Sequence, residues 1–262
     1  YQCIMCDLWK NTLRKSVRAG DIPEQIEFAI AQLPTFVSIK LYNSGNFFDQ
    51  RAIPVEDYNR IADLVRGYRQ VIVENHPKLC LEACREFAER MMPAQLEIAI
   101  GLETCHAPSL AWMNKSMTLD DFDRAIERLH QWNIETRVFL LLGLPHMSVL
   151  ESLEWTLKSI EYAASRGVDC FSVVPTRPTL SPLRQLQQSG SFQVASPKSI
   201  ESLMEHALPR KAGRVFIDLW EAATFFPCEH CRSARITRLE AMNLQQVIMP
   251  SVKCTHCCED AN

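Results

Sequence analysis

The sequence predicts an α/β fold in which strands and helices alternate and a parallel sheet closes partly or fully into a barrel. Apolar runs of strand length alternate with amphipathic helical segments, and the alternating unit repeats about every 30 to 35 residues. The strands are apolar on both faces, as expected where helices cover a parallel sheet. The chain has 262 residues, of which 47% are hydrophobic, so it can bury such a core.

The individual elements follow in order up to about residue 175. Helices are predicted where a proline, acidic or capping residue opens a stretch of helical apolar spacing, at 23–33, 54–68, 79–91, 119–132 and 150–166. Thr118 is the expected N-cap of the fourth of these helices. Strands are predicted at β-branched or continuously apolar runs, at 36–42, 71–73, 96–102, 137–142 and 168–174. Beyond Pro175 the pattern weakens, and residues 180–197 are predicted to be polar and rich in turns.

Composition and length suggest three regions and exclude some classes of protein. We expect a barrel domain at 1–180, a connecting segment at 181–225 and a Cys-rich metal-binding tail at 226–262. No apolar run approaches 18 residues, so neither a membrane span nor a membrane partner is expected. Lys plus Arg number 28 against 31 Asp plus Glu, which gives no global argument for a nucleic-acid partner.

Cysteine is the unusual residue, with 11 copies. Six of them form pairs with two-residue gaps, namely Cys3/Cys6, Cys228/Cys231 and Cys254/Cys257. Disulfide scaffolds are short and rich in loops, whereas this chain is long and periodic, so the pairs are typical of metal ligands in a reducing, cytoplasmic protein. Cys80, Cys84 and Cys170 lie on apolar faces and are expected to be core thiols.

Polar residues follow several of the predicted strands, at the edge where parallel α/β sheets carry their sites. Glu103 and Arg177 stand out, because each follows a strongly apolar run. Cys105 and His106 share the strand end with Glu103, and His106 is a candidate catalytic residue. For each of these residues, the alternative is an ordinary polar loop side chain.

Three sequence segments together resemble a known enzyme family. The nine residues YQCIMCDLW (1–9) resemble the second half of the C-x3-C-x2-C loop of radical S-adenosylmethionine (radical SAM) enzymes, whose three thiolates hold a [4Fe–4S] cluster. The first Cys of that loop would fall two residues ahead of Tyr1. GLET (101–104) with MNKSMT (113–118), and FLLLGLP (139–145), resemble the elongator-type radical SAM core. LYNSGNFFD (41–49) resembles the archaeosine-synthesis branch of that family, which acts on a modified base in transfer RNA.

The resemblance covers about residues 1–180 and implies a fold, a chemistry and partners. The fold would be a partial (β/α)6 TIM-like barrel whose first strand precedes Tyr1, so that the chain is truncated there. The chemistry would be one-electron cleavage of S-adenosylmethionine at the cluster, giving a 5′-deoxyadenosyl radical that takes a hydrogen atom from substrate. The implied partners are an electron donor such as a flavodoxin or ferredoxin, and transfer RNA.

The resemblance also assigns roles to individual residues. Cys3 and Cys6 would ligate iron; without the other motifs, the same pair would suggest a zinc or redox site. Glu103 would contact ribose or methionine and is the second catalytic candidate beside His106. The remaining implied contacts to S-adenosylmethionine are Met5, Gly143 and Leu144 near the adenine, and Ser44, Gly45 and Asn46 where the family's Gly-Gly-Glu segment receives the methionine amino group. The acidic residue of that segment is missing here.

The second cysteine set has the pattern of a zinc ribbon. Cys228-x2-Cys231, 22 residues and Cys254-x2-Cys257 supply four thiolates, which would hold zinc or a second iron–sulfur cluster. Cys258 is a spare that could replace Cys257.

Arg232, Arg235 and Arg238 recur at helical spacing between the two C-terminal pairs. They predict a basic stripe that is either solvated or in contact with RNA phosphate. Two functions remain open at this point: a radical SAM enzyme, or a non-catalytic zinc-ribbon protein that binds nucleic acid on a degenerate barrel.

Overall fold

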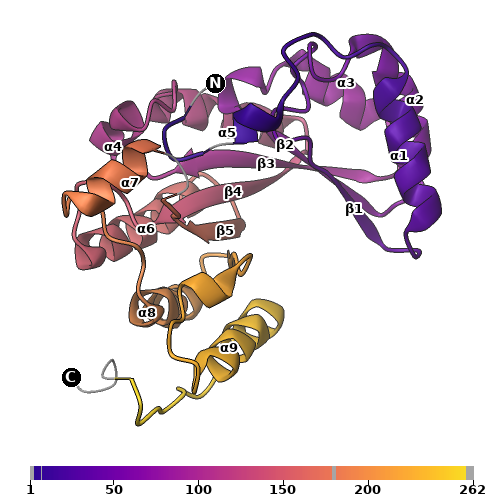
Figure 1. Cartoon of the computed structure of the whole chain (residues 1–262). Helices are drawn as coiled ribbons and strands as arrows, with labels where there is room; N and C mark the ends of the chain where they lie inside the picture. The colour runs from indigo at the N-terminus through magenta and orange to yellow at the C-terminus, as the bar shows by residue number, and fades with distance from the viewer. Residues whose placement is uncertain (1–2, 7, 179–180, 258–262) are drawn as a thin grey trace. The chain divides into compact units, whose positions relative to one another are not determined.

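The computed structural model describes residues 3–6, 8–178 and 181–257, in which strands and helices alternate (Figure 1). The described residues form two compact units. Unit 1 comprises 8–101 and 117–137, and unit 2 comprises 3–6, 102–116 and 138–257 apart from 179–180. The expected domain boundaries near 180 and 225 stay a prediction.

The described strands follow chain order in the sheet: β1 (Ser38–Leu41), β2 (Gln70–Asn75), β3 (Gln95–Glu103), β4 (Glu135–Leu142), β5 (Cys170–Pro175) and β6 (Arg214–Ile217). The α-helices are α1 (Asp21–Gln32), α2 (Tyr58–Val65), α3 (Glu82–Arg90), α4 (Ala107–Trp112), α5 (Leu119–Gln131), α6 (Val149–Ala164), α7 (Ser181–Gln188), α8 (Pro197–Ala207) and α9 (Arg232–Gln245). Short 3-10 helices are η1 (Leu8–Asn11), η2 (Val55–Asp57), η3 (Pro77–Leu79), η4 (Leu208–Arg210) and η5 (Ala222–Thr224). The predicted α/β class is confirmed, and every predicted helix and strand is present.

Unit 1 has parallel pairing from β1 to β2 and from β2 to β3, with Ser38 opposite Gln70 and Gln70 opposite Gln95. Val71 and Val73 of β2 are fully buried, as predicted for strands covered by helices. Helices α1 and α2 lie side by side in this unit (Figure 1). Among the described residues, no helix has the length and hydrophobicity that a membrane span requires.

Helix starts follow the predicted capping chemistry. The Thr118 hydroxyl accepts a hydrogen bond from the Asp121 N–H, and the Asp121 carboxylate accepts one from the Thr118 N–H. This reciprocal pair confirms the predicted N-cap of α5 and lowers the pKa of Asp121 to about 2. Ser148 and Glu151 repeat the arrangement at the start of α6.

The region after Pro175 holds more regular structure than the sequence predicts. Residues 181–188 form α7 and not a turn-rich segment, because Leu183 is fully buried and anchors an otherwise polar helix. Strand β6 was not expected, since its four residues RVFI are too short to give a periodic signal. In unit 2, β6 pairs in parallel with β5, which pairs in parallel with β4.

Helix α9 is attached to the outer edge of β6 by side-chain amides. Asn243 accepts a hydrogen bond from the Ile217 N–H and donates one to the Ile217 carbonyl, both at 2.9 Å. Gln246 does the same with Val215, at 2.7 and 2.9 Å. These bonds satisfy backbone groups that an edge strand otherwise exposes, and they fix α9 within unit 2.

Candidate functional site

The N-terminal cysteines lie in one tight turn of unit 2, here called the N-terminal turn (residues 3–6). The Cys6 N–H donates to the Cys3 carbonyl at 3.4 Å, and the Ile4 N–H donates to the Met113 carbonyl at 3.1 Å. Both thiols are partly exposed. The turn therefore presents two thiols to the surroundings while its backbone is held by the segment after α4.

A buried ion pair lies beside this turn. The Lys115 ammonium contacts the Glu103 carboxylate at 2.6 Å, and each residue is 8% exposed. The ammonium also interacts electrostatically with Cys3 and Cys6. Burial raises the pKa of Cys3, and the positive charge of Lys115 opposes that rise. The MNKSMT segment (113–118) contains Lys115, but only the structure shows that its ammonium interacts with Cys3 and Cys6.

The backbone around this pair is unusual. Glu103 has φ of 66° at the end of β3, and Asn114 and Ser116, which flank Lys115, have φ of 52° and 58°. Residues other than glycine rarely adopt this left-handed conformation, and such strained positions cluster at functional sites. The strain supports a functional role for the Glu103–Lys115 pair.

His106 is held in place within unit 2. Its Nδ1 lies 2.8 Å from the Ser109 hydroxyl, and its ring packs 4.5 Å from the Trp155 ring. Its backbone N–H donates to the Thr104 hydroxyl at 3.1 Å. These contacts orient the imidazole, while the predicted catalytic role of His106 stays a prediction.

Gly143 and Leu144 form a left-handed turn at the end of β4, with φ of 98° at Gly143. Both backbone N–H groups donate to the buried Ser152 hydroxyl, at 2.8 and 2.9 Å. A Cβ added at Gly143 would meet Thr176 at 3.5 Å. Since Ser152 occupies both N–H groups, a ligand that contacts this turn would meet its carbonyls and side chains.

Ser44, Gly45 and Asn46 belong to unit 1 and follow β1. Ser44 has φ of 56°, and the Asn43 amide donates to the Asn46 carbonyl at 3.3 Å. The Phe47 N–H donates to the backbone carbonyl of Glu74, the penultimate residue of β2. Burial raises the pKa of the Glu74 carboxyl to about 7, against the lowering effect of Lys40. The backbone of Glu74 thus contacts the residue that follows this loop, whose sequence motif lacks an acidic residue.

Arg177, at the end of β5, makes structural contacts. Its guanidinium lies 3.4 Å from the Asp218 carboxylate and donates to the Trp220 carbonyl. It also packs over the Phe225 ring at 5.1 Å. These contacts tie β5 to the segment that follows β6.

The four C-terminal cysteines converge as predicted and form the tetracysteine site (Cys228, Cys231, Cys254 and Cys257). Their sulfur atoms all lie within 4.8 Å of one another, with Cys228 to Cys254 at 3.8 Å and Cys231 to Cys257 at 3.7 Å. Four sulfurs placed ~2.3 Å from one ion in a tetrahedron are about 3.8 Å apart. The set therefore fits a single tetrahedral metal ion. Cys258, the predicted spare ligand, lies outside the described residues.

Within the tetracysteine site, the Cys254 thiol loses its proton more readily than the Cys257 thiol. The His256 N–H donates to the Cys254 sulfur at 3.4 Å, and this bond lowers the pKa of Cys254 to about 6. Burial raises the pKa of Cys257 to about 12. A metal ion would have to displace the proton from that thiol.

The predicted basic stripe does not exist as a surface. Arg235 and Arg238 are 4% and 5% exposed, and both pair with Glu201 of α8. Arg232 donates to the carbonyls of Phe226 and Pro227. Both predicted alternatives, a solvated face and a phosphate contact, are therefore wrong for Arg235 and Arg238, because helical spacing does not tell an inward face from an outward one when the partner carboxylate is distant in sequence.

Three further cysteines behave as expected. Cys80, Cys84 and Cys170 are fully buried. The thiols of Cys80 and Cys84 donate to the carbonyls of His76 and Leu79. Their predicted role as core thiols is confirmed.

Comparison with known proteins adds relatives with low identity. No family model matches the chain. It is 28% identical over 141 residues to the archaeosine synthase subunit beta of Thermococcus kodakarensis, covering 52% of this chain and 43% of that protein. It is 27% identical over 172 residues to the same-named subunit of Methanosarcina acetivorans, covering 62% and 49%. The chain spans about half the length of the curated relatives it matches.

Solved structures share the fold. Coproporphyrinogen III oxidase of Escherichia coli, a radical SAM enzyme, matches with a TM-score of 0.55 and 13% identity over 80% of this chain and 49% of that chain. A radical SAM methyltransferase from Sphaerobacter thermophilus matches with 0.55 and 16% over 83% and 62%. Elp3 of Methanocaldococcus infernus matches with 0.57 and 17% over 75% and 51%.

The chain has the fold of these radical SAM enzymes. The predicted resemblance to that fold and to archaeosine synthase subunit beta is confirmed.

Proposed function

We propose that the protein is a radical SAM enzyme whose N-terminal turn holds a [4Fe–4S] cluster. The observation that carries the proposal is the placement of Cys3 and Cys6 beside the buried Glu103–Lys115 pair. Two partly exposed thiols next to a fixed positive charge suit an anionic iron–sulfur cluster, because the charge favours the thiolate form and offsets the cluster's own charge. The radical SAM fold supports the same assignment.

The donor set fits the cluster as far as the described residues go. Cys3 and Cys6 would supply two of the three thiolates that the resemblance implies. When bound, the cluster supplies the electron that cleaves S-adenosylmethionine to methionine and a 5′-deoxyadenosyl radical. The protein's own contribution is to hold the turn through the Ile4 to Met113 hydrogen bond and to keep Lys115 charged through Glu103.

Contacts to S-adenosylmethionine are proposed for residues of unit 2. Met5 shares the turn with the cysteines, and Glu103, Gly143 and Leu144 lie at strand ends. For Ser44, Gly45 and Asn46 of unit 1, the contact that the resemblance implies stays a prediction. Glu103 already pairs with Lys115. Its role toward the cofactor would be to position the Lys115 ammonium, whose positive charge would act on both the cysteine thiolates and the ligand. His106, which follows Glu103 by three residues, is the side chain proposed to donate or accept a proton.

For the substrate, we propose a nucleobase in transfer RNA. The support is the archaeosine synthase relatives, whose name as subunit beta also supports assembly with a further subunit. An electron donor such as a flavodoxin or ferredoxin would supply the reducing electron, and a reducing cytoplasm would keep the thiols free. Because Arg235 and Arg238 are buried and paired, they support RNA contact neither in this proposal nor in the rival one, a non-catalytic zinc protein that binds nucleic acid. The archaeosine synthase relatives favour the enzyme.

For the tetracysteine site, we propose zinc. The sulfur separations of 3.7 and 3.8 Å match one tetrahedral ion, whereas the thiolates of a cubane cluster bind four different irons and must lie farther apart. A closed set of four protein ligands is typical of a structural zinc site. Metal analysis of the purified protein should give one zinc per chain, and a metal–sulfur distance near ~2.3 Å by X-ray absorption with no metal–metal scattering. Metal–metal scattering from this site would overturn the assignment.

The function is tested by anaerobic reconstitution of protein from the complete reading frame with iron and sulfide. With S-adenosylmethionine and dithionite, the protein should release 5′-deoxyadenosine, and Cys6→Ser should not. Cys105→Ser is the matched control, because Cys105 is a partly exposed thiol of the same unit that is not in the turn. If the reconstituted wild type forms no 5′-deoxyadenosine, or if Cys6→Ser forms as much, the proposal fails.

A further inference from the structure

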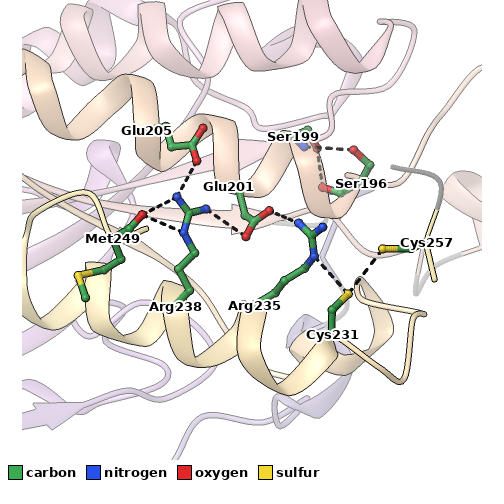
Figure 2. Close-up of polar contacts among 9 residues, drawn as sticks. All are labelled: Ser196, Ser199, Glu201, Glu205, Cys231, Arg235, Arg238, Met249 and Cys257. Atoms are coloured by element: carbon green, nitrogen blue, oxygen red, sulfur yellow. Dashed lines mark hydrogen bonds and ion pairs between the residues drawn. The ribbon is translucent and has the colours of Figure 1, made fainter. Parts of the chain in front are cut away.

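A buried cluster of charges connects α8 and α9 next to the tetracysteine site (Figure 2). Glu201 of α8 receives the guanidinium groups of both Arg235 and Arg238 of α9, with Arg238 at 3.1 Å. Arg238 also contacts Glu205 at 2.7 Å and donates to the Met249 carbonyl. Glu201 and the two arginines are at most 6% exposed. Buried ion pairs add little net stability.

One of these arginines also contacts a proposed metal ligand. The Arg235 Nε–H donates to the Cys231 sulfur at 3.3 Å, while the other edge of the same guanidinium binds Glu201 (Figure 2). Arg235 follows Cys231 by four residues, so the two side chains share a face of the helix start. Because the guanidinium is planar and rigid, its hold on Glu201 fixes the direction from which the N–H meets the sulfur.

Charge supports the same role. Cys231 is 4% exposed, whereas the other three cysteines of the tetracysteine site are partly exposed. Four thiolates around a divalent ion carry a net negative charge, which is costly to bury without a nearby cation. Glu201 and Glu205 together balance the charges of Arg235 and Arg238, so the specific contribution of Arg235 at the sulfur is its directed N–H bond. Arg235 thus offers a charged hydrogen-bond donor to the most buried thiolate.

We propose that Arg235 is a positioning residue of the tetracysteine site. By bridging Cys231 and Glu201, it orients the Cys231 sulfur for the metal and makes metal retention depend on the Arg235–Glu201 ion pair between α9 and α8. Hydrogen-bonded partners of metal ligands commonly have this effect on affinity. The inference rests on the zinc assignment proposed above and is independent of the cluster in the N-terminal turn.

The test is the rate at which zinc-loaded, full-length protein loses zinc to an excess of a chromogenic chelator. Arg235→Gln should release zinc on the order of 10- to 100-fold faster than wild type. Arg238→Gln is the matched control, because Arg238 shares Glu201 and the same helix but does not touch sulfur. It should release zinc at close to the wild-type rate. Release from Arg235→Gln at the wild-type rate, or equal acceleration in both variants, would overturn the proposal.

A spectroscopic measurement separates positioning from general loosening. With Co²⁺ in place of zinc, loss of the N–H to sulfur bond makes the Cys231 thiolate a stronger donor. The thiolate-to-cobalt charge-transfer band should therefore move to longer wavelength in Arg235→Gln and stay in place in Arg238→Gln. An unmoved band in Arg235→Gln contradicts the proposal.

If Arg235→Gln does not fold, Glu201→Gln provides the reading, because it keeps Arg235 and weakens only its anchor. Release should then be faster than wild type and slower than from a variant without Cys231, and an unchanged rate would count against the bridge. A wild-type protein that retains no zinc removes the zinc assignment and this inference together. Zinc-loaded variants that behave as wild type remove this inference alone.

Discussion

The two cysteine sites of unit 2 share one arrangement of charges but differ in how the cation acts on the thiols. Each places a buried cation, itself bound to a buried carboxylate, beside thiols: Lys115 with Glu103 at the N-terminal turn, and Arg235 with Glu201 at the tetracysteine site. At the first, two partly exposed thiols lie in a turn. At the second, four sulfurs converge and one is almost fully buried.

The difference between the cations follows the difference between the sites. Arg235 donates one directed bond to one sulfur, which suits a site whose geometry must stay fixed. Lys115 acts on both Cys3 and Cys6 through its charge, which suits a site whose charge changes during a reaction. An open thiol pair with a charge beside it and a closed set of four with a directed bond are the arrangements typical of catalytic and structural metal sites, respectively.

The largest expected effect comes from removing one ligand from each site in turn. Cys6→Ser should abolish 5′-deoxyadenosine formation and leave one zinc per chain, because its thiol belongs to the open site alone. Cys254→Ser should lose the zinc and about 4 kcal/mol of stability at a zinc concentration on the order of 1,000-fold above the dissociation constant. Iron and zinc content, activity and urea unfolding report the results for both variants. Loss of zinc from Cys6→Ser would show that the sites are not separate.

A smaller effect is expected from the cation of the open site. Lys115→Met leaves the Glu103 carboxylate buried without its partner, at a cost of about 3 to 5 kcal/mol in unfolding free energy. The double variant Lys115→Met/Glu103→Gln should recover most of that stability in urea unfolding, because no buried charge remains. Its reconstituted cluster should nevertheless have a lower reduction potential than wild type, since Lys115 acts on Cys3 more strongly than the Glu103 carboxylate that is removed with it. An unchanged potential would reduce Lys115 to a packing role.

The smallest effect is a difference in pH dependence between the two cations. Burial acts to lower the pKa of Lys115, but the Glu103 carboxylate outweighs it, and the folded pKa lies above the ordinary value of 10.5. The stability that Lys115 contributes is therefore complete below that ordinary value and is lost as the pH rises through the folded pKa.

The measurement is urea unfolding between about pH 8 and 12. The difference in unfolding free energy between wild type and Lys115→Met/Glu103→Gln should narrow above about pH 10.5. The corresponding difference between wild type and zinc-loaded Arg235→Gln should stay constant, because arginine keeps its proton. If the difference in unfolding free energy between wild type and Lys115→Met/Glu103→Gln stays constant up to the highest pH, folding does not change the pKa of the Lys115 ammonium.

Sequence periodicity was sufficient for the regular part of the fold and for the cysteine pairs. Strand and helix patterns up to Pro175 record which faces are buried, and the two-residue gaps record ligand spacing. Helix α7 and strand β6 were missed because one carries few apolar residues and the other is very short. The partners of Arg235 and Lys115 were not predictable, since Glu201 lies 34 residues from Arg235 and nothing in either segment marks the pairing. Tertiary packing alone decides that an arginine faces inward.

The sharing of Glu201 has a consequence for protein engineering. A four-cysteine metal site built from two C-x2-C pairs is commonly regarded as a unit that can be cut out and joined to another protein. Here, a graft of residues 226–262 would carry Arg235 and Arg238 without the α8 carboxylates that receive them. It would also leave the amides of Asn243 and Gln246 without the backbone of β6. A transferable form of the tetracysteine site would need α8 and β6 as well. The graft would therefore have to begin at residue 197 and run to residue 257 of the described chain.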